Sequence, residues 1–478
     1  MPAAVATAVC IVGILGLFVL DRDRSVRTSK ALWIPVTWLL IVASRPVSVW
    51  LNIAPQTQSP EQYLEGSPLD RFVFLGLLLV GLFVVVRRGR PVLQVLRRNA
   101  PIGLYFSYCL ASTFWSDYPD VALKRWIKAV GDVVMVLVIL TDPEPLAALR
   151  GVLTRVGFVL LPLSVLFIKY YPDLGRGYDP GFGFWKPMYT GVTTNKNSLG
   201  GLVLIFGIGA VWHFLELVRT KNTPHRRRHF IAQSVLLVTT IWLLWMANSA
   251  TSTSCFIIAA CLIVATTVFN LGRKPVVIHF LVAAAVSLPL YALFLDPGSG
   301  LIESVGRNAT LTGRTALWSL LLGLPVNRLF GTGFESFWLG KRLQEIWSVY
   351  WWHPNEAHNG YIEILLNLGW IGVTLLAILL VAGYRNIILG FRRDPNTGSL
   401  KLAYFTVAII YSFTEAAFRM LGLAWIFLLL ATAAIASTSV HDSGPSDVID
   451  PTDQTDRIAE REPVFGYALS VRPYRESL

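Results

Sequence analysis

Long apolar runs separated by short polar segments repeat along most of this chain. Each run is long enough to cross about 30 Å of hydrocarbon as a helix. The runs are continuous rather than alternating, which favours helices over the strands of a barrel. The pattern predicts an all-α integral membrane protein with about 12–13 transmembrane helices, at 3–20, 31–50, 70–86, 100–116, 126–141, 151–169, 198–217, 230–247, 253–269, 275–295, 362–383, 400–416 and 420–437.

Composition agrees with this pattern. The 478 residues are 54% hydrophobic and only 15% charged, whereas a soluble domain carries about 25% charged residues. We therefore expect one polytopic membrane domain at 1–437. The remainder, 438–478, is rich in Asp, Pro, Ser and Arg. It cannot bury a core, and we expect a disordered cytoplasmic tail.

The net charge of +12 has a simple origin in the loops. Basic residues gather at 21–30, 87–98, 218–229 and 384–399, which the span pattern places on one side of the membrane. The positive-inside rule assigns that side to the cytoplasm. It puts the N-terminus and the long polar segment 296–361 outside. Nucleic acid is not an expected partner, because no basic face or binding motif accompanies the charge.

Segment 296–361 is the longest polar stretch between apolar runs and the first candidate site. Thr312 or Gly313 can cap a short helix beginning near Arg314. A cation in a first turn is unfavourable against the helix dipole, and guanidinium suits two-point phosphate contacts. The alternative is a solvated or headgroup-binding arginine. The segment also holds Arg307, His358, Trp318, Trp351 and Trp352, and aromatic rings suit sugar rings as well as membrane interfaces.

Other polar residues outside that segment are candidates for binding an anionic substrate. Residues 170–197 are rich in glycine and contain Arg176, Lys196 and Asn197. A turn of this kind before a helix can present amides and cations to an anion, although an ordinary surface loop is the alternative. Arg45 falls inside the second predicted span, where a cation requires a partner or a role. Glu415 and Arg419, near the end of the twelfth span, raise the same question and can act as structural counter-ions.

The sequence from His353 to His358 does not predict a metal site. It is not a His-Glu-x-x-His motif, and Pro354 interrupts the helical register that two ligating histidines need. No cysteine or further carboxylate nearby completes a ligand set. We expect neither a metal nor a cofactor.

These residues resemble the bacterial superfamily of O-antigen ligases and of O-antigen and exopolysaccharide polymerases. The family motif is His-Asn, nine residues, Gly, two residues, Gly, and it is matched here by His358-Asn359, Gly369 and Gly372. Further resemblance lies in Gly313-Arg314-Thr-Ala-Leu-Trp318, Lys196-Asn197-Ser-Leu-Gly200 and the Arg-x-x-x-Leu spacing of Arg307 to Leu311. Ser44-Arg45-Pro46 and Phe114-Trp-Ser116-Asp-Tyr-Pro119 resemble the exopolysaccharide-polymerase branch most.

The resemblance implies a metal-independent, inverting glycosyltransferase in the bacterial inner membrane, with its catalytic loop in the periplasm. Its donor would be a polyprenyl-diphosphate-linked oligosaccharide, its acceptor a glycan or lipid-linked glycan, and a chain-length regulator a possible partner. His358, Arg314 and Arg307 would be catalytic. The substrate-binding residues would be Lys196, Asn197, Arg176, Arg45, Asn359, Trp318, Trp351 and Trp352.

Three alternatives stay open from the sequence. The enzyme can be a polymerase that extends repeat units, or an O-antigen ligase that moves glycan to the lipid A core. It can also be a transporter or flippase of lipid-linked sugars, which would place its charges near the bilayer midplane. The sequence does not decide which of Arg307 and Arg314 is essential. It also names no sugar, linkage, acceptor or oligomeric state.

Overall fold

Helices make up nearly all regular structure in the computed structural model, which describes residues 1–23, 28–53, 66–178, 187–220, 226–269, 274–294 and 314–434. These residues belong to the unit Met1–Ala436, and the predicted tail 438–478 lies outside them. In chain order the elements are α1 (Ala3–Leu20), η1 (Lys30–Leu32), α2 (Trp33–Val42), α3 (Val47–Trp50), α5 (Pro68–Arg88), α6 (Arg90–Arg98), α7 (Ala100–Ala111), η2 (Ser112–Trp115), α8 (Pro119–Leu140), α9 (Pro145–Tyr170), α10 (Pro172–Gly175), β1 (Arg176–Tyr178), β2 (Pro187–Tyr189), α11 (Lys196–Arg219), α12 (Arg226–Ala247), α13 (Ala250–Thr267), α14 (Pro275–Phe294), α16 (Arg314–Gly323), α17 (Gly340–Val349), α18 (Gly360–Phe391), α19 (Pro395–Tyr411) and α20 (Leu423–Thr432).

The helices confirm the predicted all-α membrane class. Every predicted span contains a helix, and α1 has the predicted bounds. Within the described residues, seven helices are long and apolar enough to cross a membrane: α1, α5, α9, α11, α12, α13 and α18. Shorter apolar helices lie at Lys30–Val42, Pro275–Leu288 and Leu423–Thr432. The protein is a multi-pass membrane protein, while the count of 12–13 crossings stays a prediction.

Three boundaries differ from the sequence prediction. The second span is broken between α2 and α3, because Pro46 cannot continue a helix and instead caps the start of α3. The expected loop 87–98 contains α6, an amphipathic helix that buries Val92 and Val95. In the segment 170–197, β1 and β2 pair antiparallel, with Arg176 opposite Tyr189.

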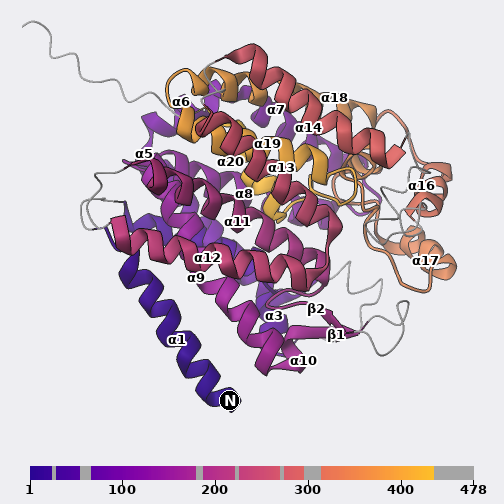
Figure 1. Cartoon of the computed structure of the whole chain (residues 1–478). Coiled ribbons are helices and arrows are strands. Elements are labelled where there is room, and N and C mark those ends of the chain that lie inside the picture. The colour runs from indigo at the N-terminus through magenta and orange to yellow at the C-terminus, as the bar shows by residue number, and fades with distance from the viewer. Residues whose placement is uncertain are drawn as a thin grey trace, which may run out of the picture. The chain divides into compact units, whose positions relative to one another are not determined.

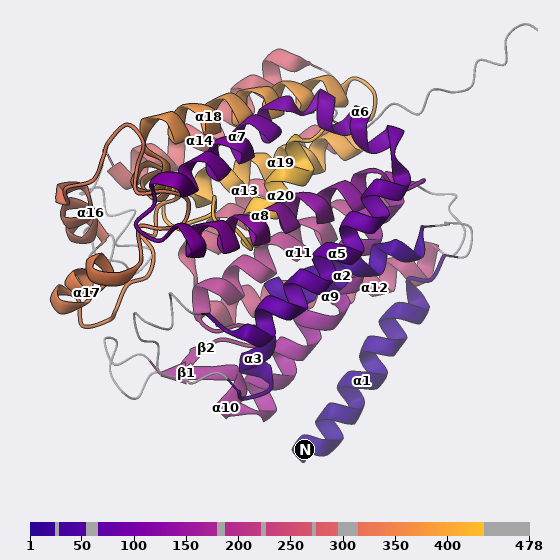
Figure 2. The same ribbon diagram turned by 180° about the vertical axis from the view of Figure 1, so that it is seen from behind.

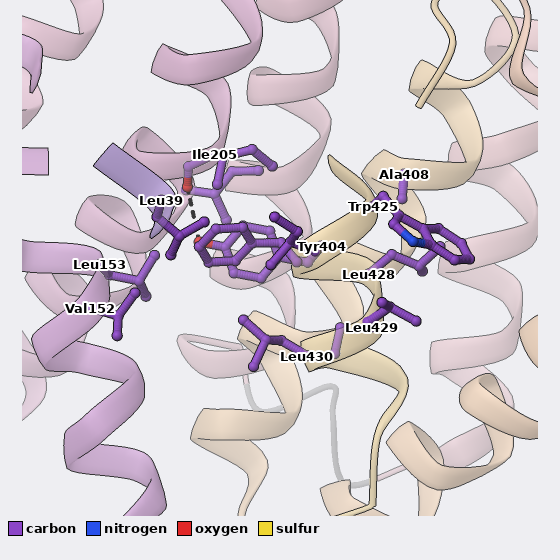
Figure 3. Packing of buried hydrophobic residues seen from close by; sticks show 14 of the residues in the cluster. Leu39, Val152, Leu153, Ile205, Tyr404, Ala408, Trp425, Leu428, Leu429 and Leu430 are labelled. Carbon is purple, nitrogen blue, oxygen red and sulfur yellow. Dashed lines mark hydrogen bonds between the residues drawn. The ribbon is translucent and has the colours of Figure 1, made fainter. Parts of the chain in front are cut away.

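The core is a layer of apolar side chains shared by α2, α9, α11, α19 and α20 (Figure 3). Tyr404 of α19 lies in this layer and donates its hydroxyl to the carbonyl of Ile205, 2.9 Å away. Helices at the periphery expose large apolar residues, among them Phe72 and Phe83 of α5 and Trp245 of α12. In lipid such surfaces carry no hydrophobic penalty, so the exposed apolar faces are those of a membrane domain.

The basic segments meet at one end of the helix bundle. Arg88 is bonded to Ser29 and Asp142 there, and His229 is 3.1 Å from Asp21. Helix α6 lies at this end, and α16 and α17 lie at the opposite end, as both views show (Figure 1, Figure 2). The contacts therefore agree with the clustering of basic loops that the sequence predicts.

Candidate active site

Helix α18 is broken at Gly369, the first glycine of the sequence motif. Its φ of 65° and ψ of −168° are not helical, and a Cβ at this position would collide with the carbonyl oxygen of Leu329. The break frees backbone groups in α18, and the segment 328–333 pairs with them. Its bonds include Thr332 N to Leu366 O at 3.1 Å and Trp370 N to Arg328 O at 2.9 Å. Glycine is therefore required at position 369, where the segment 328–333 packs against α18.

The histidine-asparagine pair of the motif sits at the start of the same helix. Asn359 is the N-cap of α18, and its Oδ1 accepts from the backbone of Tyr361 and Ile362 at 3.0 and 3.1 Å. Its amide nitrogen donates to the carbonyl of Phe413 at 3.3 Å. The N–H of Gly360 bonds the carbonyl of Ser412 at 2.8 Å. The start of α18 is thereby fixed to the turn that follows α19.

Six alternating charges form a continuous chain beside this helix start. We call them the charged cluster: Arg314, Glu415, His358, Glu356, Arg419 and Glu335. Glu415 lies at its centre, accepting from Arg314 at 3.0 Å and lying 3.3 Å from Nδ1 of His358. Glu356 contacts the same Nδ1 at 2.9 Å. The cluster joins the start of α16, the segment 335–358 and the 412–422 turn between α19 and α20.

The pKa of His358 is raised by its neighbours in the cluster. Burial alone would lower its pKa, but attraction and hydrogen bonding to Glu356 and Glu415 raise the pKa to about 9. Burial would raise the pKa of Glu356, yet His358, Arg419 and Arg314 together bring that pKa to about 2. His358 is therefore an imidazolium at neutral pH. Its Nδ1 is held by carboxylates, while its Nε2 makes no hydrogen bond within the described residues.

Several helix starts converge on the turn that holds Glu415. The first two turns of α11 approach Tyr411, whose hydroxyl would lie 3.2 Å from a Cβ at Gly201. Thr251, in the first turn of α13, bonds Thr414 at 2.9 Å. The start of α18 is joined to the same turn, as described above. Arg314, the first residue of α16, donates to the carbonyl of Thr414. The positive ends of the α13 and α18 dipoles and the guanidinium of Arg314 therefore meet at this turn.

Two predicted substrate-binding arginines have structural contacts instead. Arg45 lies at the break between α2 and α3, not inside a helix as expected. It donates to the carbonyls of Thr193 (3.1 Å) and Leu174 and lies over Trp50. Arg176 donates to the carbonyl of Ile168 at 3.0 Å. These bonds tie Leu174, Arg176 and Thr193 to the helix bundle, and a role of either arginine in substrate binding stays a prediction.

The predicted tryptophans fall into two groups. Trp318 is buried and donates at 2.7 Å to the carbonyl of Ala357, a member of a small second apolar core. Trp351 and Trp352 are exposed, and the ring of Trp352 is stacked near His358 with centroids 6.1 Å apart. Only the exposed pair can meet a ligand without rearrangement of the loop.

The remaining predicted residues are Lys196, Asn197 and Arg307. Lys196 and Asn197 are the first residues of α11 and are partly exposed, at the helix start that approaches Tyr411. Arg307, the other candidate for an essential arginine, lies outside the described residues. Of the two arginines, the structure places only Arg314 in the charged cluster.

Glu415 also changes the argument about metals. The sequence reasoning found no further carboxylate near Glu356 and His358, but Glu415 brings a ligand atom within 4.8 Å of theirs. The ground for excluding a metal was therefore wrong. Outer oxygens of both carboxylates are also in contact with Arg314 or Arg419, so these pairs would compete with any cation. Metal independence stays a prediction.

Comparisons with known proteins identify the relatives of this chain. A family model described as O-antigen ligase matches residues 235–379, which include Arg314, His358 and Gly369 but not Glu415. The exopolysaccharide production protein ExoQ of Rhizobium meliloti (strain 1021) is 27% identical over 309 residues, covering 61% of this chain and 66% of that protein. This chain thus spans just under two thirds of that relative's length. Together with the motif, the two matches support the predicted resemblance of this chain to the superfamily of O-antigen ligases and exopolysaccharide polymerases.

Proposed function

We propose that the protein transfers or polymerises polyprenyl-diphosphate-linked oligosaccharide units at the periplasmic face of the bacterial inner membrane. The products would belong to exopolysaccharide or O-antigen biosynthesis. The resemblance to the family supports the class of reaction. The observation that carries the proposal is the charged cluster beside the starts of α13 and α18, in which Arg314 and His358 share Glu415.

The arrangement suits a diphosphate leaving group. Negative charge grows on the diphosphate as the glycosidic bond breaks, and fixed donors aimed at that charge stabilise the transition state. Arg314 supplies a planar fork, and the helix starts add partial positive charge. A hydroxyl of the acceptor glycan that attacks the sugar directly would invert the anomeric centre. These donors are on the protein, so the proposed mechanism needs no metal.

A catalytic His358 can act as a base toward the acceptor hydroxyl or as a cation toward the diphosphate. The carboxylates at Nδ1 favour the cation, because they keep the imidazole protonated at neutral pH. The Nε2–H can then donate to a diphosphate oxygen, as an arginine would. We therefore assign His358 to the leaving group rather than to the acceptor hydroxyl.

Between the two kinds of transferase, ExoQ favours a polymerase because its name concerns exopolysaccharide production. The description of the family model favours the alternative, a ligase that transfers glycan to the lipid A core. A transporter of lipid-linked sugars fits less well. Its charges would lie on broken helices near the midplane, whereas this cluster lies at the loop-bearing end of α18.

The proposal is tested by Arg314→Lys and His358→Ala, with Arg342→Lys as the matched control. Arg342 belongs to the same outer loop and pairs with Asp117 at 2.8 Å, away from the cluster. Lysine keeps the charge of Arg314 but loses its fork, which should lower the transfer rate about 10²–10³-fold. Lipid-linked single repeat units should accumulate in both test variants but not in the control. Polymer of normal length in both test variants, at equal protein abundance on immunoblots, would contradict this site.

A further inference from the structure

The peptide group of Ala357, directly before His358, is held from both sides. Ala357 is completely buried. Its N–H donates to Oε1 of Glu363, and its carbonyl accepts from Nε1 of Trp318 at 2.7 Å. These bonds come from two different helices, because Glu363 lies in α18 and Trp318 in α16. The backbone that leads into His358 is therefore fixed in space.

The Glu363 carboxylate is itself fixed by other donors. Nε1 of Trp338 lies 3.0 Å from each of its oxygens, and the amide of Asn367 donates to Oε2 at 3.3 Å. A buried carboxylate is costly unless such bonds satisfy it. An amide in its place would offer a single acceptor oxygen and add two donors, so it could not serve Ala357, Trp338 and Asn367 together.

His358 needs this support because its backbone is unfavourable. Its φ of 49° lies in the left-handed region, which a residue with a side chain adopts only when its surroundings hold it there. Ala357 is fixed on one side of His358, and the capping residue Asn359 is fixed on the other. The two anchors together aim the imidazole at Glu356 and Glu415.

We propose that Glu363 is a positioning residue, which acts through the Ala357 peptide to hold the His358 ring between its carboxylate partners. Trp318 is the second support of the same peptide. Both residues lie behind His358 and contact no reacting group in the proposed transfer, so their effect is on geometry. The inference rests on the proposed function for its activity assay.

The test compares Glu363→Gln and Trp318→Phe with Trp347→Phe. The control removes a bond of the same type in the same loop, from Nε1 of Trp347 to the carbonyl of Pro354 at 2.8 Å. The test variants should lower kcat by about 10- to 100-fold, since a small displacement of a fixed group has effects of this size. KM for the lipid-linked donor should change little. The alkaline limb of the pH–rate profile should move to lower pH, because a displaced imidazole loses its carboxylate partners.

The proposal would be overturned if kcat and the alkaline limb of the pH–rate profile were both unchanged in Glu363→Gln and Trp318→Phe. The proposal would also fail if the test variants and Trp347→Phe all lost kcat while the alkaline limb of the pH–rate profile stayed in place. Glu363 and Trp318 would then only stabilise the loop before α18. If Glu363→Gln does not reach the membrane, Trp318→Phe carries the test, since it removes one N–H and keeps an aromatic ring. Full activity of His358→Ala would instead refute the proposed function, which keeps the two failures distinct.

Discussion

Replacing Glu356 with glutamine should move the pH at which transfer is lost. Glu356 is the nearer of the two carboxylates at Nδ1 of His358, at 2.9 Å against 3.3 Å for Glu415. Together they raise the pKa of His358 from its usual 6.5 to about 9, a difference worth about 3 kcal/mol. Burial opposes the rise, so the attraction itself is larger. Glu356→Gln should therefore lower this pKa by about 1–2 units.

The sign of the effect follows from the raised pKa. The imidazolium contributes to stability fully below pH 6.5, and this contribution is lost as pH rises through about 9. If the cation is also what stabilises the leaving group, kcat/KM for the donor should fall with an alkaline midpoint near 9 in the native protein. In Glu356→Gln the midpoint should fall to about 7–8.

The assay is conversion of lipid-linked repeat units by detergent-purified protein across this pH range. Glu345→Gln is the matched control, because Glu345 is an exposed carboxylate of the same loop, in α17. Its midpoint should equal that of the native protein. Equal midpoints for the native protein and Glu356→Gln would refute the reasoning that the carboxylates set the charge state of a required His358.

Three further predictions concern metals, the motif glycine and orientation. Glycan transfer in detergent should survive EDTA, and a loss restored by added Mg²⁺ or Zn²⁺ would show that Glu356, His358 and Glu415 hold an ion. Gly369→Ala should reduce folded protein in the membrane, because it adds left-handed strain of about 1–2 kcal/mol to a collision with Leu329; Gly390→Ala, with open space at its Cβ position, should not. Reporter fusions after Arg90, Arg227 and Arg393 should indicate the cytoplasm and a fusion at Leu343 the periplasm, and a cytoplasmic signal at Leu343 would exclude the proposed mechanism.

The sequence was sufficient for the positions of the helices, because continuous apolar runs reflect a local requirement for hydrogen-bonded backbone in lipid. It also placed a short helix at Arg314, where α16 begins. The break after Ala43 was missed, although Pro46 was a visible signal for it. The bonds of Arg45 to the carbonyls of Leu174 and Thr193, more than a hundred residues away, have no signal in the sequence, and its role in substrate binding stays a prediction.

The charged cluster is only partly predictable, because its members lie far apart in the sequence. Glu415 lies 57 residues from His358 and 101 from Arg314, and no periodicity links such positions. Glu415 and Arg419 stand out at the end of an apolar run, but the sequence indicates no partner for either charge and suggests only structural counter-ions. Glu335 and Glu363 carried no signal, since a single glutamate in a polar loop or first turn is ordinary. Their roles follow from packing, which a single sequence does not specify.

The balance of charges in the cluster bears on selectivity. Three cations and three carboxylates alternate and cancel, so the cluster presents little net field to distant anions. An incoming ligand must instead displace a carboxylate from a cation, as in ion exchange. A diphosphate carries more negative charge than one carboxylate and can engage a guanidinium at two points, so it can replace Glu415, whereas chloride offers only a single contact. Resting neutrality would thus act as a filter that rejects the common small anions of the surrounding fluid.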